Sequence, residues 1–257
     1  MSVPAEDLLP TESMVLCEGY YDRAFWAGLL RRLRCTDPGQ QPGRSARRAV
    51  RDPWGDPVSH GQFAFLSPSG QFIRVVPCRG AGNILDSARD RLHLLATRDL
   101  RRLILNYDTD RDPAETAAGA AAAQNRVDGF VREFGGARAG DQWTVEKTTV
   151  ALACWQAQDS PLDGLPGLQT LERLICAAVV AAYPARGPSV QRWLDTRPDS
   201  AQTGPKHYVW SFYAGWYAHH GAESFYQHVW EDERVATELE SRLAHVGIWP
   251  VVAEMAV

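Results

Sequence analysis

The sequence predicts an α/β fold that continues into a helical C-terminal part. Up to about residue 157, short apolar segments alternate with segments in which apolar residues recur at helical spacing. This alternation is typical of a largely parallel sheet whose strands are joined by helices. Beyond that point only helical patterns continue. We therefore predict an α/β domain over residues 12–157 and a helical extension over residues 158–257.

The composition is that of a globular protein and argues against several other classes. The 257 residues are 45% hydrophobic, which is enough to bury a sizeable core. The net charge of −4 lacks the excess of Lys and Arg usual in phosphate binders, although an acidic site can offset a local basic patch. The five Cys include no CxxC pair, so neither a disulfide framework nor a zinc site is expected. Without a signal peptide or a membrane-length apolar run, we expect a soluble cytoplasmic protein that does not contact a membrane.

The first half of the predicted domain begins with a buried strand. Met14–Cys17 is a short apolar run, and apolar residues at helical spacing follow Asp22. Residues 36–60 are rich in Pro, Gly, Arg and Asp and predict a long surface loop. Gln62–Leu66 and Gln71–Val76 flank a turn-like Ser-Pro-Ser-Gly and predict a hairpin.

The second half repeats the alternation. A helix is expected over Ile84–Ala96, and Arg102–Tyr107 is a second strongly apolar strand. The Ala-rich segment Ala114–Phe134 predicts a helix because Ala has the highest helix propensity. Gln142–Ala157 is then expected to form one further strand, and Lys147 on it is a minor alternative for a catalytic base or a phosphate contact.

The helical extension contains three predicted helices. The patterns place them at Leu171–Tyr183, over an aromatic-rich stretch at Lys206–Trp230 that Gly221 interrupts, and at Asp232–His245. Residues 184–205 are read as mostly loop, and the chain ends in a short apolar tail. The aromatic side chains could stack on nucleobases, but such a stripe more often forms core or a partner interface.

Three carboxylates follow the two strongest strands. Glu18 comes directly after the first strand, and Asp108 and Asp110 come directly after the apolar run that ends at Tyr107. The carboxyl ends of parallel strands meet at one edge of a sheet, so these side chains are expected to converge. Converging carboxylates repel one another, and a bound hard cation such as Mg²⁺ relieves that repulsion. The competing interpretation of Asp108 and Asp110 is an Asx turn or helix cap, although Asp112 before the Ala-rich helix is the better cap.

The two acidic segments resemble the two motifs of Toprim domains. MVLCEGYYDRAFWAGLL is similar to the first motif, an apolar strand ending in E-G-x-x-D before a helix, and RLILNYDTDRDP is similar to the second, a strand ending in D-x-D. The resemblance implies a mainly parallel four-stranded sheet flanked by helices. It also implies that Glu18, Asp108 and Asp110 bind metal, and Asp22 matches the acid that follows the E-G turn in the nuclease-like branch.

Two later residues resemble the OLD-type branch of this family. Glu172 in LPGLQTLERLI matches a further helical acid, and Lys206 in GPKHYVWSF matches a lysine expected after it. The extension would then complete the site. The alternative for Glu172 is an exposed helix carboxylate beside Arg173, and the alternative for Lys206 is a solvated residue near a helix start.

The resemblance implies an enzyme that hydrolyses nucleic-acid phosphodiesters, DNA in preference to RNA, in antiviral defence or DNA repair. Its cofactor would be Mg²⁺, with Mn²⁺ as a substitute, and two ions would be held by Glu18, Asp22, Asp108, Asp110 and Glu172, with Lys206 beside the phosphate. The chain has no P-loop, so an ATPase or another defence protein is an expected partner, as is a second copy of the chain.

Two other functions remain open at this stage. The chain could be a Toprim-fold binding or regulatory subunit that acts through a protein partner without catalysis. It could also resemble a primase, although the missing zinc ribbon counts against that.

Overall fold

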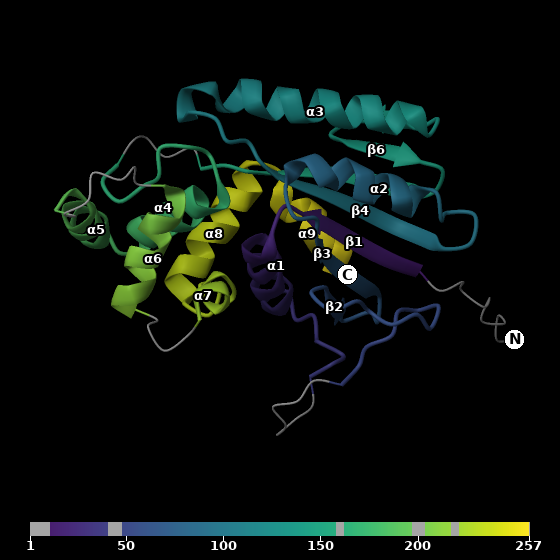
Figure 1. Ribbon diagram of the computed structural model, residues 1–257, viewed down its shortest axis with the longest axis horizontal. Coiled ribbons are helices and arrows are strands. Elements are labelled where there is room, and N and C mark those ends of the chain that lie inside the picture. Colours follow the sequence, from purple (N-terminus) through teal and green to yellow (C-terminus); the bar gives the residue numbers. More distant parts are fainter. Residues whose placement is uncertain (1–10, 41–47, 158–161, 197–203, 217–220, 257) are drawn as a thin grey trace, which may run out of the picture.

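The computed structural model describes residues 11–40, 48–157, 162–196, 204–216 and 221–256 (Figure 1). Its centre is a seven-stranded sheet with the strand order β2-β3-β1-β4-β7-β6-β5. The strands are β1 (Thr11–Cys17), β2 (Phe63–Leu66), β3 (Phe72–Pro77), β4 (Asp99–Asp108), β5 (Ala137–Ala139), β6 (Gln142–Val145) and β7 (Thr148–Trp155).

The α/β class is confirmed, and the sheet is larger than expected. Four neighbouring strands, β3, β1, β4 and β7, are parallel and form the centre. Three strands pair antiparallel at the edges, β2 on one side and β6 with β5 on the other. The four-stranded sheet implied by the resemblance was therefore too small, because it does not include the antiparallel edge strands β2, β6 and β5.

Helices cover both faces of the sheet, as Figure 1 shows. On one face lie α2 (Ile84–Leu92) and α3 (Thr116–Glu133), which pack on Leu16 of β1 and on Leu103 and Leu105 of β4. The 3-10 turns η1 (Ala81–Asn83) and η2 (Pro113–Glu115) lead into these two helices. Asp112 accepts a hydrogen bond from the Ala114 N–H and so caps η2, the turn before the Ala-rich helix, whereas the N-cap residue of α3 itself is Glu115.

The other face is covered by α1 (Tyr20–Arg32) together with the C-terminal helices. These are α4 (Leu171–Ala182), α5 (Arg186–Asp195), α6 (Pro205–Trp216), α7 (Ala222–His228), α8 (Glu233–His245) and α9 (Ile248–Ala256). They share one buried core with Val15 of β1 and Ile104 of β4. A Cβ added at Gly28 of α1 would lie 2.4 Å from the carbonyl oxygen of Gln227 on α7, so the backbones of α1 and α7 are in close contact. Residues on both sides of position 158 thus contribute to the same core.

The prediction of a single strand over Gln142–Ala157 was wrong. The segment is a hairpin in which β6 and β7 pair antiparallel, with Val145 opposite Thr148. Glu146 at the turn has a φ of 51°, a left-handed conformation that residues other than Gly seldom adopt. Lys147, the other turn residue, precedes β7 and lies at the amino end of that strand.

Two further predictions are corrected at the C-terminal end. Arg186–Asp195, within the predicted loop, forms α5, which buries Val190 and Leu194. The short apolar tail forms α9, which buries Ile248 and Val252. Among the described residues, no helix has the length and apolar character needed to cross a bilayer.

The parallel register fixes the edge at which the acids lie. Leu16 of β1 pairs with Leu105 of β4, and Cys17 pairs with Pro77 of β3. The carboxyl ends of the three strands are therefore adjacent. Glu18 follows the end of β1, and Asp108 is the last residue of β4.

Candidate functional site

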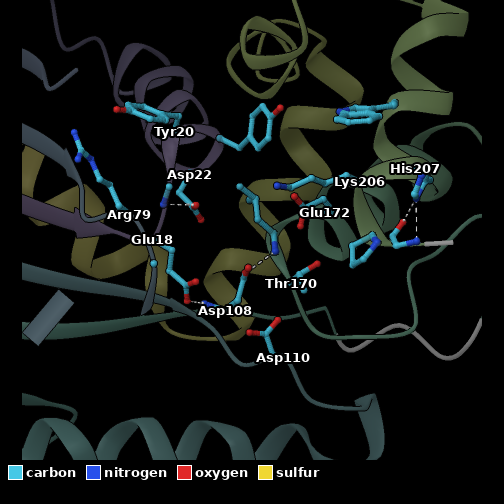
Figure 2. A pocket seen from close by; sticks show the side chains of 17 residues that line it. Glu18, Tyr20, Asp22, Arg79, Asp108, Asp110, Thr170, Glu172, Lys206 and His207 are labelled. Carbon is cyan, nitrogen blue, oxygen red and sulfur yellow. Dashed lines mark hydrogen bonds between the residues drawn. The ribbon is translucent and has the colours of Figure 1, made fainter. Parts of the chain in front are cut away.

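A pocket of about 920 Å³ opens at the carboxyl ends of β1 and β4 (Figure 2). All six residues singled out in the sequence line it: Glu18, Asp22, Asp108, Asp110, Glu172 and Lys206. The remaining lining residues come from the segment after β3, the first turns of α1 and α4, and the start of α6: Gly19, Tyr20, Tyr21, Arg79, Gly80, Thr170, Leu171, Gly204, Pro205, His207 and Trp210.

Glu18 connects the ends of the two central strands. Its Oε1 accepts a hydrogen bond of 2.9 Å from the Asp108 N–H, and its carbonyl oxygen accepts one of 2.8 Å from the Gly80 N–H. Burial raises the pKa of Glu18 from 4.5 to about 7, and the carboxylates of Asp22 and Asp110 act in the same direction. Glu18 is therefore a carboxyl group whose ionisation is disfavoured by its surroundings.

Asp22 is buried in the first turn of α1. Its Oδ2 accepts a hydrogen bond from the Gly19 N–H at 3.0 Å, which closes the turn after β1. Its Oδ1 accepts a hydrogen bond from the Trp155 indole N–H at 2.8 Å. Burial raises the pKa of Asp22 to about 6, and nearby Glu172 acts in the same direction. Asp22 thus ties the Glu18–Gly19 turn to the end of β7.

Asp108 joins β4 to the start of α4. Its Oδ1 accepts a hydrogen bond of 2.8 Å from the N–H of Leu171, the first residue of that helix. A helix N-terminus favours a carboxylate because its backbone N–H groups are unpaired. Burial nevertheless raises the pKa of Asp108 well above its ordinary value, as do the charges of Asp22, Glu172 and Glu18.

Asp110 is the exposed acid of the group. Its φ of 50° lies in the left-handed region, which turns the chain sharply after β4. Its N–H donates a hydrogen bond of 3.1 Å to the Gln169 carbonyl oxygen, and the Gln169 N–H donates one of 2.8 Å to the Arg111 carbonyl oxygen. This pair of bonds holds the segment after β4 against the segment before α4. The side chain of Asp110 makes no hydrogen bond to another described residue, so both of its oxygens are available to a ligand.

Glu172 and Lys206 bring the helical part into the pocket. Glu172 is only 6% exposed, which contradicts the interpretation of a solvent-exposed helix carboxylate. Its Oε1 accepts a hydrogen bond of 3.0 Å from the Tyr226 hydroxyl. The Tyr226 ring stacks on Tyr21 at 4.6 Å between centroids, and the Lys206 Nζ lies 4.9 Å from the centroid of Tyr21. The acid and the cation are thus positioned by one pair of stacked rings.

Some residues that shape the site were missed by the sequence analysis. Gln169 is 1% exposed; its side chain bonds both the N–H and the carbonyl of Ala157 and also the Thr116 hydroxyl. It therefore fixes the end of β7 and the start of α3 relative to α4. Arg79, after β3, lines the pocket as an exposed cation. A single Gln or Arg between elements carries no sequence pattern that would have identified either residue.

Lys147 and most of the aromatic stripe lie outside the site. Lys147, at the amino end of β7, does not line the pocket with the acids, so the alternative that made it a site residue is not supported. Phe212, Phe225 and Trp230 are buried, as expected for core residues. Among the described aromatic side chains of this stripe, Trp210 is 42% exposed and lines the pocket.

The donor set fits a magnesium ion only in part as it stands. No group of three or more His, Cys, Asp or Glu side chains in the described ranges is arranged to hold an ion. Glu18, Asp108 and Glu172 each direct one oxygen to a protein donor and leave the second oxygen for another ligand. Mg²⁺ typically takes one or two carboxylates and completes its shell with water and phosphate oxygens. The raised pKa values mark a place where a cation would relieve repulsion.

Comparisons with known proteins identify a shared fold. No protein-family model matches the chain, and no curated protein is similar in sequence. The structure is similar to the crystal structure of a hypothetical protein, PH0156, from Pyrococcus horikoshii OT3, with a TM-score of 0.62 at 13% sequence identity. The similarity covers 96% of this chain and 100% of that chain. The chain therefore shares with that protein a fold that includes both the sheet and the C-terminal helices.

Proposed function

We propose that this chain is a magnesium-dependent nuclease with a Toprim-like centre that hydrolyses nucleic-acid phosphodiesters. One observation carries the proposal. Five carboxyl groups from three distant parts of the sequence line a single pocket together with Lys206: Glu18 and Asp22 after β1 and on α1, Asp108 and Asp110 at and after the end of β4, and Glu172 on α4. Such a grouping is costly without a ligand, because burial and mutual repulsion raise the pKa of Glu18, Asp22 and Asp108. A cation with a phosphate group would offset that cost.

The position of each residue in the pocket would determine its role. Glu18, Asp108 and Asp110 would hold one ion, and Glu172 with Asp22 would lie closest to a second. Asp22 already accepts two hydrogen bonds, so its larger contribution is to fix the Glu18 turn. A bound ion supplies electrostatic stabilisation of the attacking and leaving oxygens. Lys206 and Arg79, the exposed cations of the pocket, would orient the phosphate and offset the charge that develops on it.

The decisive experiment removes the charge of Asp110, whose side chain makes no hydrogen bond to another described residue. Asp110→Asn should lower the rate of cleavage by at least ~10²-fold in magnesium or manganese, more than the loss typical for a residue that only supports a ligand. The substrates are single- and double-stranded DNA and RNA. Asp112→Asn is the matched control, because Asp112 lies outside the pocket and an amide oxygen can still cap Ala114. Cleavage that Asp110→Asn leaves at the wild-type rate would refute the proposal.

A binding or regulatory subunit is the second candidate. Two observations favour it: no group of three or more acids among the described residues is arranged to hold an ion, and one oxygen each of Glu18, Asp108 and Glu172 already accepts a hydrogen bond from a protein donor. Calorimetric titration with Mg²⁺ separates the candidates when it is combined with the cleavage assay. Magnesium binding that Asp110→Asn abolishes, together with cleavage, supports the nuclease. A role in antiviral defence or DNA repair belongs to the same proposal and rests on the resemblance to the OLD-type branch. An ATPase partner is proposed because this chain has no P-loop of its own.

A further inference from the structure

The ring of Tyr20 is held at the edge of the pocket with one face supported. Tyr20 is the first residue of α1, two positions after Glu18, and is 46% exposed. The guanidinium carbon of Arg23 lies 4.8 Å from the centroid of its ring and 4.0 Å from the centroid of Phe63. Arg23 also donates a hydrogen bond to the Gly61 carbonyl oxygen. Arg23 therefore links the ring to β2 and to the loop before it.

The exposed Tyr20 ring belongs to the lining of the pocket. Tyr20 lines the pocket, and within the described ranges it makes no further ring or cation contact. Figure 2 shows Tyr20 and Arg79 on one side of the pocket and Lys206 on the other, with the carboxyl groups between them. A nucleotide is complementary to the ring and the two cations, since it has a flat base next to a negative phosphate.

The size and depth of the pocket argue against a paired duplex. A volume of about 920 Å³ is of the order of small-ligand sites, which span roughly 300–1,000 Å³. Asp22 and Glu172 at its base are 7% and 6% exposed. An unpaired strand can bring a phosphate close to these acids without deforming a double helix, and its bases are free to leave their stack. An exposed aromatic ring compensates for the stacking that such a base loses.

We propose that Tyr20 is a stacking platform for an unpaired nucleobase, so that the pocket takes single-stranded nucleic acid. The inference rests on the proposed function, because it assumes that a phosphodiester lies beside the carboxyl groups. It assigns to Tyr20 the selection of single strands over duplexes. Arg79 and Lys206 contact the backbone phosphates, which carry no base identity.

The experiment separates binding from cleavage. A fluorescent single strand of DNA or RNA about 16 nucleotides long, the upper end of common site sizes, is titrated with the full chain in calcium, and a duplex of the same sequence is titrated in parallel. Tyr20→Ala should raise the Kd for the single strand by roughly 5- to 140-fold, and Tyr20→Phe should restore it. Trp193→Ala is the control, because Trp193 is a 66% exposed aromatic residue on α5 outside the pocket.

Each outcome supports or overturns the platform. A single-strand preference that Tyr20→Ala removes and Tyr20→Phe restores supports it. Equal affinity for the duplex, a Tyr20→Ala variant that binds like the Trp193→Ala variant, or no binding of single strands overturns it. Cleavage in magnesium is measured separately. Tyr20-dependent binding without cleavage keeps the platform and refutes the nuclease, whereas duplex cleavage that Tyr20→Ala leaves unchanged keeps the nuclease and refutes the platform.

Discussion

The buried acid Asp22 makes the stability of the metal-free protein depend on pH. It is 7% exposed, and burial raises its pKa from 3.8 to about 6. Between these two pH values the folded state keeps a proton that the unfolded state has lost. The unfolded chain therefore binds fewer protons, and the free energy of unfolding falls as the pH rises through this window. Above about pH 6 the folded protein bears the full free-energy cost of ionising the buried Asp22 carboxyl group.

The size of the effect follows from the two pKa values. The difference between 3.8 and about 6 is 2.2 pH units, and each unit corresponds to about 1.36 kcal/mol. Asp22 alone should then lower the free energy of unfolding by about 3 kcal/mol between pH 4 and pH 7. For a domain of this size that corresponds to a fall in Tm of about 6–12 °C. Glu18 acts in the same direction between pH 4.5 and about 7.

Urea denaturation in EDTA at intervals from about pH 4 to about pH 7 measures this dependence. Glu12, a buried acid whose pKa is also raised by burial, contributes to the total slope. The variant Asp22→Asn isolates the contribution of Asp22, because its amide has no proton to lose in this pH range. The stability of the wild type relative to Asp22→Asn should fall by up to about 3 kcal/mol across the window. A wild type and variant that change in parallel with pH would refute the reasoning.

Two further predictions concern packing and the acid on α4. Gly28→Ala places a methyl group 2.4 Å from the Gln227 carbonyl oxygen and should cost about 1–3 kcal/mol of stability. The control Gly129→Ala, in an open position on α3, should be neutral or stabilising by up to about 1 kcal/mol. Equal urea midpoints for the two variants would contradict the close contact between α1 and α7. Tyr226→Phe removes the hydrogen bond to Glu172 and should cost about 1–3 kcal/mol of stability in the same assay. An unchanged urea midpoint would mean that the Tyr226 hydroxyl does not stabilise the buried Glu172.

The central strands and their acids could be predicted because they are local in the sequence. A parallel strand buried on both faces reads as a continuous apolar run, as in Met14–Cys17 and Leu103–Leu105. Glu18 and Asp108 lie where these strands end, so the strand signal places them. The turn at Glu146 could not be predicted, because its left-handed residue is not a Gly. Strand β5 is exposed along its length and has no apolar pattern.

The supporting contacts of the site could not be predicted because they join distant elements. Lys206 and Glu172 were found through a motif resemblance, but the ring pair that positions them, Tyr21 and Tyr226, lies on two different helices. Only packing brings α1 and α7 together. The role of Gln169 likewise depends on three segments meeting at one point. Sequence spacing holds no information about such meetings.

The shared core has a consequence for the order in which the site comes into being. A chain emerges from the ribosome with its N-terminal end first. Glu18 and Asp108 are made early, but Glu172 and Lys206 reach the pocket only after α4 and α6 have been made and packed into the core that they share with α1. A half-made chain thus holds an acidic sheet edge without its lysine or its helical wall. Assembly of the pocket is therefore a late event in synthesis, and an unfinished chain lacks a complete site.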